Sequence, residues 1–263
     1  GQSAAWLAPL AEAITRHVKA GITLHADDTP VPVLDPGRQK TKTGRLWTLV
    51  RDERPWGSAA PPAVSYLYSP DRKSEHARRL LEGCSGFLHA DGYAGFERLY
   101  AADPFTGQAR LGEVACFAHA RRKFFEVYAN TASPLAMEAL ERIGQLFAIE
   151  AEIKGKHPPQ RHAARQQRSR PLLDDLRCFL ERALSQISKK SSLAGAIRYS
   201  LTRWNALGRY TEDGRLEISN NAAERAIKPL ASAESLCPSS SSVWKHWKLV
   251  GRGLVTRAAL AGE

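Results

Sequence analysis

Acidic residues stand at three points of the sequence where separate structural elements are expected to begin or end. Asp27 and Asp28 follow one short apolar run, Asp91 follows another, and Glu224 lies in the first turn of a late helix pattern. Carboxylates from separate elements can hold two Mg²⁺ ions about 4 Å apart, as phosphoryl transfer on polynucleotides requires. Aspartates before a proline are also typical of turns, so the spacing alone leaves both interpretations open.

The composition is that of a globular protein with an excess of positive charge. The 263 residues are 43% hydrophobic and 25% charged, and the formal net charge is +11 with a pI near 9.7. Lys and Arg attract the phosphate backbone, so nucleic acid is the leading partner, and a basic surface kept for solubility is the alternative. We find no apolar run long enough to span a membrane and no secretion signal, so we expect an intracellular protein.

The cysteine pattern favours free thiols. Cys84, Cys116, Cys178 and Cys237 are scattered without C-x-x-C pairs, which argues against a disulfide framework and a four-cysteine zinc site. Cys116 and His119 have C-x-x-H spacing, but no second ligand pair lies at a suitable distance. For His119 a packed or surface position is favoured, and a group that polarises a phosphate near metals is the alternative.

Hydrophobic patterning predicts a mixed α/β core followed by a helical region. Strands are expected at residues 22–26, 46–50, 63–68, 86–90 and 114–118, the first three as an antiparallel meander. Pro30 is expected to limit the first strand. Helices are expected at residues 6–19, at 74–82 with Ser74 as the cap, after His119, at 135–153, 171–187 and 192–210, and from 222 to about 228. In the helical region, Tyr199 and Trp204 have the spacing of core residues.

The basic stretch 154–170 indicates either a solvated face or a DNA groove. Basic residues also cluster in three other expected elements. These elements are a flexible loop or hairpin at 35–45, the start of the helix after His119, and the late helix that carries Glu224. The first two are either solvated or in contact with phosphate, whereas Arg225 and Lys228 on the late helix either contact DNA or neutralise the acidic site. The residues expected to contact DNA are Lys40, Lys42, Arg45, Arg121, Arg122, Lys123, Arg225 and Lys228.

Six segments resemble, in this order, the catalytic part of IS66-family insertion-sequence transposases. They are LHADDTPVPVLDPGRQKTKTGRLW, FLHADGYAGFERLY, CFAHARRKFFEVY, RSRPLLDDL, AIRYSLTRW and LEISNNAAERAIKPL. The resemblance runs from about residue 1 to about residue 230. It implies a DDE transposase with a ribonuclease-H-like fold, a mixed sheet flanked by helices with a helical insertion before the last catalytic helix.

The resemblance also implies the chemistry and its residues. Asp27, Asp91 and Glu224 would form the catalytic triad and hold two Mg²⁺ ions, for which Mn²⁺ can substitute. Supporting or capping roles would fall to Asp28, His119, Asn220 and Asn221. Activated water would cut double-stranded DNA at the element ends, and the freed 3′-hydroxyl would attack target DNA. A homo-oligomer on DNA, in the bacterial cytoplasm and associated with the nucleoid, is implied.

This interpretation divides the chain into four parts. Residues 1–132 form the first part of the core, 133–215 the helical insertion, 216–230 the catalytic helix, and 231–263 an aberrant, poorly ordered tail. The tail reads ASAESLCPSSSS where the family continues with a segment of the type GRKNWLFAGS. The family's N-terminal DNA-binding parts are absent from the sequence. The alternatives are therefore an inactive DNA-binding remnant and a ribonuclease-H-like nuclease that does not join strands.

Strand periodicity separates the two adjacent aspartates. Side chains alternate along a strand, so Leu24, Ala26 and Asp28 share one face, and His25 and Asp27 share the other. If the apolar set packs into the core, Asp27 lies on the face where metals bind. Asp28 is then the capping or supporting residue.

Overall fold

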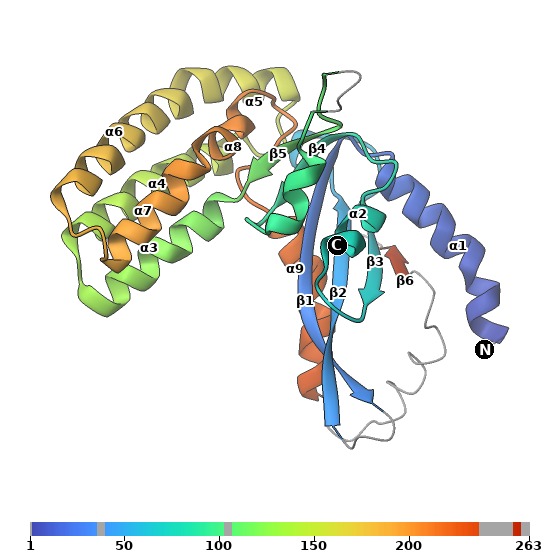
Figure 1. Ribbon diagram of the computed structural model, residues 1–263. Helices are drawn as coiled ribbons and strands as arrows, with labels where there is room; N and C mark the ends of the chain where they lie inside the picture. Colours follow the sequence, from blue (N-terminus) through green and yellow to red (C-terminus); the bar gives the residue numbers. More distant parts are fainter. Residues whose placement is uncertain (1, 36–39, 103–106, 237–254, 259–263) are drawn as a thin grey trace.

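The protein is an α/β structure built on one mixed sheet (Figure 1). The structure is a computed structural model, and it describes residues 2–35, 40–102, 107–236 and 255–258. The strands lie in the order β5-β4-β1-β2-β3-β6. β1, β2 and β3 form an antiparallel meander, as the sequence predicts. The structure adds that β4 pairs in parallel with β1, and β5 in parallel with β4. The bounds are β1 (Thr23–Asp35), β2 (Lys40–Arg51), β3 (Ala63–Ser69), β4 (Gly86–Ala90), β5 (Leu111–Ala115) and β6 (Val255–Ala258).

The first strand is much longer than expected, and the prediction that proline would limit it is wrong. β1 continues through Pro30 and Pro32 to Asp35, and β2 pairs with it throughout this extension. β4 pairs only with the first three residues of β1. Beyond them, β1 is paired with β2 on one edge, and its other edge has no neighbouring strand among the described residues. Prolines two residues apart direct their nitrogens to the same edge, and an open edge tolerates their missing N–H groups.

The last expected strand and the helix after it are shifted along the chain. β5 begins and ends earlier than residues 114–118 because it pairs in register with β4 and stops at Ala115, level with the end of β4. α3 (Phe117–Thr131) then begins, and the N–H of Phe117 donates to the carbonyl of Ile218 (3.0 Å). His119 therefore lies in the first turn of α3.

The expected helix at 74–82 is α2 (Ser74–Leu80), but Ser74 does not cap it. The residue before the helix is Lys73, and no side chain there bonds to the first turn. Gly83 has a φ of 80°, so the left-handed conformation that ends the segment falls on a glycine, as the sequence predicts.

Helices cover both faces of the sheet, and the sheet separates the hydrophobic core on one face from that on the other. α1 (Gln2–Lys19), α2 and the 3-10 helix η2 (Ala94–Leu99) pack on the face that carries Leu24, Ala26 and Leu88. α9 (Asn221–Leu236) crosses the opposite face and packs on β1 and β2 (Figure 1). The elements of the acidic triad meet on this second face.

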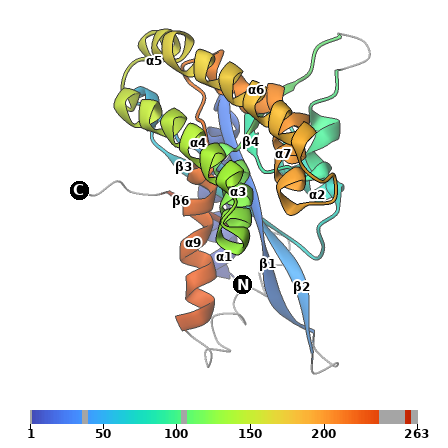
Figure 2. The same ribbon diagram turned by 90° about the vertical axis from the view of Figure 1, so that its left-hand side faces the viewer.

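The remaining helices form, together with α3, a separate layer that extends away from the sheet (Figure 1) and faces the viewer in Figure 2. Its core contains Trp204, and Tyr199 packs against it, so the expectation of core positions is confirmed. The layer is reached through β5, whose Val114 and Ala115 belong to the same core. The bounds are α4 (Pro134–Ile153), α5 (Pro158–Ala164), the π-helix η3 (Arg165–Ser169), α6 (Arg170–Gln186), α7 (Ser192–Thr202), α8 (Trp204–Gly208) and η4 (Arg209–Thr211).

The basic stretch 154–170 is largely helical, and two of its arginines face neither solvent nor a groove. Arg161 and Arg165 are 1% and 0% exposed. The guanidinium of Arg165 donates hydrogen bonds from Nε and Nη2 to the carboxylate of Glu150 (2.8 and 2.6 Å). Its Nη2 also donates to the carbonyl of Leu216 (2.8 Å). These bonds fasten the helical layer to the segment that leads into α9.

The N-terminal helix exposes an apolar surface, and the C-terminal part of the described chain contains regular structure. α1 exposes Trp6, Leu7 and Leu10 and buries Val18. α9 continues to Leu236 and residues 255–258 form β6 beside β3, so these two parts of the range expected to be a tail have regular structure. The rest of that expectation lies outside the described residues. Among the helices that the structure describes, none is long and apolar enough to cross a membrane.

Candidate active site

Asp27 and Asp91 converge because their strands are parallel neighbours. The register pairs His25 with His89, and each aspartate follows its histidine by two residues. Side chains two apart point to the same face, so both carboxylates lie on the face that α9 covers. The N–H of Tyr93 donates to Asp91 (3.2 Å), and the chain turns away from the sheet there.

Glu224 joins them from the first turn of α9, and Asn220 holds that turn against β1. The side chain of Asn220, which is fully buried, donates to the carbonyl of Ala26 (2.8 Å) and accepts from Nδ1 of His25 (3.2 Å). Its backbone carbonyl receives the N–H groups of Ala223 and Glu224. The prediction that its side chain caps α9 is therefore corrected, because the side chain binds β1. The half-buried Asn221 is the first residue of the helix.

A stacked pair of buried histidines lies beneath the carboxylates. The rings of His25 and His89 are 4.2 Å apart and inclined by 18°. Nδ1 of His89 donates to the carbonyl of Leu24 (3.1 Å), and its Nε2 accepts from the N–H of Glu217 (2.9 Å). Burial lowers the pKa of His25 to about 4 and that of His89 well below the usual range. Both rings are neutral at pH 7, and they tie β1, β4 and the approach to α9 together.

Asp27 is a carboxylate without a cation. Its pKa is raised to about 7, first by burial and also by the charges of Asp91, Asp28 and Glu224, while the N–H of Asp28, which donates to it (2.8 Å), acts in the opposite direction. Asp27 forms no ion pair among the described residues. The sequence predicted that these three carboxylates come from separate elements. In the structure Asp91 and Glu224 lie close enough to Asp27 for their charges to raise its pKa.

Asp28 has the opposite environment, as strand alternation predicts. Its side chain is 2% exposed and forms ion pairs with Arg45 (3.1 Å) and Arg72 (2.7 Å). Both carboxylate oxygens accept from Arg72, so the contact is bidentate. Arg45, expected to contact DNA, is thus engaged within the protein.

Arg72 is a residue that sequence reasoning missed. One of its nitrogens lies 3.9 Å from a carboxylate oxygen of Asp91, and its guanidinium lies 4.2 Å from the centre of the Tyr93 ring. It follows β3 in a short polar connection, and no local pattern marks it. The only signal was indirect, because a buried Asp28 requires a cationic partner from elsewhere in the fold.

His119 and Cys116 lie against Glu224. Nδ1 of His119 is 3.8 Å from Oε1 of Glu224, and neither atom has a hydrogen-bond partner although both are buried. The Cys116 sulfur accepts from the N–H of Asn220 (3.2 Å), and burial raises the pKa of its thiol. The sequence left the roles of both residues open, and the structure places them at the site. Cys84, Cys116 and Cys178 are free thiols, and Cys237 lies outside the described residues.

The other residues expected to contact DNA are mostly exposed. On α3 and α9 the exposed ones are Arg121, Arg122, Lys123, Arg225 and Lys228, and on β2 Lys42 is exposed. Lys123 also lies 4.6 Å from the ring centre of Tyr199. The side chain of Lys40 is outside the described ones. These positions are compatible with phosphate contact, and the sequence's alternative of a solvated surface fits them equally.

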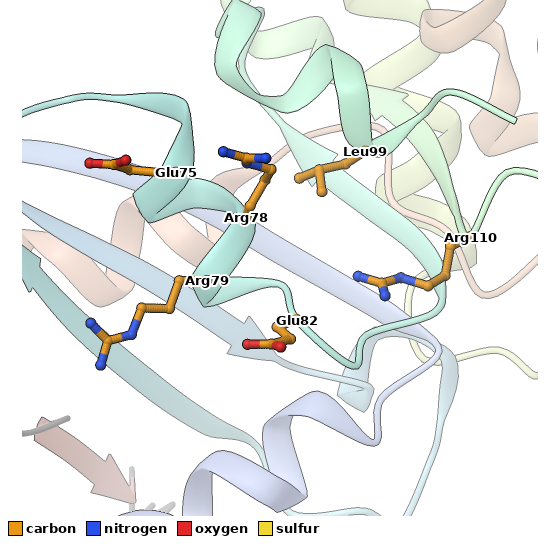
Figure 3. A pocket seen from close by; sticks show the side chains of 6 residues that line it. All are labelled: Glu75, Arg78, Arg79, Glu82, Leu99 and Arg110. Atoms are coloured by element: carbon orange, nitrogen blue, oxygen red, sulfur yellow. The ribbon is translucent and has the colours of Figure 1, made fainter. Parts of the chain in front are cut away.

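A cavity of about 340 Å³ lies elsewhere, beside α2 (Figure 3). None of the residues of the acidic site lines it. Its walls mix three arginines with two glutamates, and Arg110 also donates to the carbonyl of Leu81 (3.1 Å). The lining residues are Glu75, Arg78, Arg79, Glu82, Leu99 and Arg110.

Comparison with known proteins identifies the family. The model of the IS66 transposase family matches residues 1–242, and the chain belongs to that family. It is 40% identical to the uncharacterised protein y4hP of Sinorhizobium fredii over 88% of this chain and 43% of that protein. It is 38% identical to the uncharacterised protein y4qI of the same organism, over 94% and 46%. The chain thus spans less than half the length of these curated relatives. No solved structure matches it.

Proposed function

We propose that this chain is the catalytic part of a DNA transposase that cuts element ends and joins them to target DNA. The observation that carries the proposal is the convergence of Asp27, Asp91 and Glu224 on one face of the sheet, in a family of transposases. A ribonuclease-H-like fold belongs to the same proposal. It is supported by the mixed sheet, by two carboxylates at the ends of neighbouring parallel strands, and by a third on the helix that packs on them.

The donor set fits Mg²⁺, with Mn²⁺ as a substitute. Mg²⁺ prefers carboxylate oxygens, and the unpaired, half-buried carboxylate of Asp27 is what a cation would stabilise. Two such ions are proposed, as phosphoryl transfer on polynucleotides requires. Asp27, Asp91 and Glu224 would hold them. When bound, such ions supply Lewis-acid chemistry at the scissile phosphate.

The chain's own residues would position DNA and the triad. Asn220 fixes the start of α9, and therefore Glu224, against β1. Asp28 anchors Arg72 beside Asp91, where its guanidinium adds a positive charge that can meet a DNA phosphate. The exposed lysines and arginines of α3 and α9 extend this positive surface. Double-stranded DNA and assembly into a homo-oligomer on it are part of the proposal.

The test is metal-dependent joining of labelled element-end DNA by the full-length protein. Asp91→Asn should lower joining by at least a hundredfold while leaving salt-dependent DNA binding measurable. The matched control is Asp174→Asn, since Asp174 is an exposed aspartate on α6 and should not matter. Undiminished joining by Asp91→Asn would refute the triad. Cleavage without joined products would favour the nuclease, and binding without cleavage the inactive remnant.

A further inference from the structure

Three ligand atoms of mixed chemistry meet where the starts of α3 and α9 come together. Cys116 directly precedes α3, His119 lies in its first turn, and Glu224 lies in the first turn of α9. The Cys116 sulfur, a ring nitrogen of His119 and a carboxylate oxygen of Glu224 all lie within 4.8 Å of one another. Residues three apart at a helix start share a side, which explains how the C-x-x-H pair faces Glu224.

Two of these atoms lack a partner. Nδ1 of His119 and Oε1 of Glu224 are buried without a hydrogen bond, at a separation of 3.8 Å. Buried polar atoms normally have hydrogen-bond partners. Two neighbouring buried atoms without partners therefore indicate a site for a ligand that bonds to both. In a tetrahedral zinc site, a nitrogen and an oxygen ligand at 2.0–2.2 Å from the ion are about 3.3–3.6 Å apart. The observed 3.8 Å would have to shorten by only a few tenths of an ångström for the two atoms to share one cation.

We propose that Cys116, His119 and Glu224 form a binding site for a borderline-soft divalent cation of the Zn²⁺ type, and that its occupancy inhibits the enzyme by withdrawing Glu224 from Mg²⁺. A thiolate and an imidazole select Zn²⁺ over Mg²⁺, whereas an all-carboxylate set favours Mg²⁺. On binding, the thiol proton passes to solvent and the sulfur bonds to the cation, without any redox change. The inhibition rests on the proposed function, whereas cation binding does not.

The direct test is titration of the metal-free chain with Co²⁺, a spectroscopic substitute for Zn²⁺. One equivalent should give the visible bands of a tetrahedral site together with a sulfur-to-cobalt charge-transfer band, and Zn²⁺ should displace it. Cys116→Ser should abolish the charge-transfer band and weaken Zn²⁺ binding at least tenfold. Cys178→Ser, the same change at an exposed cysteine, should leave both unchanged.

A second variant and an activity assay complete the test. His119→Gln should also weaken Zn²⁺ binding at least tenfold, which keeps the proposal testable if Cys116→Ser does not fold. In the full-length protein, Zn²⁺ should inhibit Mg²⁺-dependent joining, and Cys116→Ser should need at least tenfold more Zn²⁺ for half-inhibition of its own activity. A Co²⁺ spectrum without the sulfur band, or equal Zn²⁺ affinity in Cys116→Ser, would overturn the site. Absence of joining under every condition would overturn the proposed function alone.

Discussion

Asp27 and Asp28 are adjacent in β1, yet two arginines neutralise Asp28 while Asp27 has no cationic partner among the described residues. The difference follows from strand geometry, because neighbouring side chains point to opposite faces. The ion pairs of Asp28 stabilise the fold, whereas the unpaired negative charge of Asp27 lowers its stability. The two positions should therefore respond oppositely to the same substitution.

Asp27→Asn should stabilise the metal-free protein at pH 8, and Asp28→Asn should destabilise it. The folded-state pKa of Asp27 is raised to about 7 from 3.8, so its charge opposes folding increasingly as pH rises from about 4 to 7. We expect a gain of roughly 2–4 kcal/mol in the free energy of unfolding, from 1.36 kcal/mol per pKa unit reduced for partial exposure. Denaturant titrations should show a smaller gain at pH 5, where the unfolded-state carboxyl is already ionised, and the larger gain at pH 8. A loss of stability at pH 8 would contradict it.

The stacked histidines should make the fold acid-sensitive. The folded-state pKa of His25 is lowered to about 4, so stability is fully present above pH 6.5 and is lost as pH falls from 6.5 to 4. The loss from His25 alone is about 3 kcal/mol. His25→Phe keeps a ring beside His89 but cannot bind a proton, so it should be less stable at pH 7 and lose less between pH 7 and 4.5. Equal losses in both proteins, measured by urea unfolding, would refute this.

The buried arginine cluster predicts a contrast between two residues of the same π-helix. Arg165→Met leaves Glu150 buried without its bidentate partner and should cost about 3–5 kcal/mol. Arg168→Met breaks an exposed pair with Glu152 and should cost under about 1 kcal/mol. Arg165→Lys should not restore stability, because an ammonium cannot reproduce the fork on Glu150. Thermal and denaturant unfolding measure all three, and similar costs for Arg165→Met and Arg168→Met would contradict the assignment.

The end of α3 offers a stabilising substitution. Ala132 has a φ of 49°, and it is the one residue other than glycine with positive φ in the part of the chain that the structure describes. Glycine adopts this conformation at a helix end without steric cost, so Ala132→Gly should raise the free energy of unfolding by about 0.5–1 kcal/mol. Ala129→Gly, one turn earlier on the exposed side of the helix, should lower it by about the same amount. Destabilisation by Ala132→Gly would be the contrary result.

Local patterns in the sequence predicted the meander, β4, most helices, and the opposite orientations of Asp27 and Asp28. They did not reveal the length of β1, because tolerance of Pro30 and Pro32 depends on which edge is paired. They also left Arg161 and Arg165 as surface charges, since their buried partners come from other elements. For the same reason Arg72 was missed at the site. Periodicity reports which side of an element is apolar, whereas pairing of buried charges depends on contacts distant in the chain.

The bond from Asn220 to Ala26 also bears on synthesis of the chain. These residues are 194 positions apart. At about 5–20 residues per second, a ribosome needs roughly 10–40 seconds to make the intervening segment. During that interval the emerging chain carries Asp27, and later Asp91, without the helix that completes the site. A ribosome-bound fragment that ends before residue 216 should therefore fold its first strands but lack Glu224. The acidic site would be complete only after the last part of the chain has been translated.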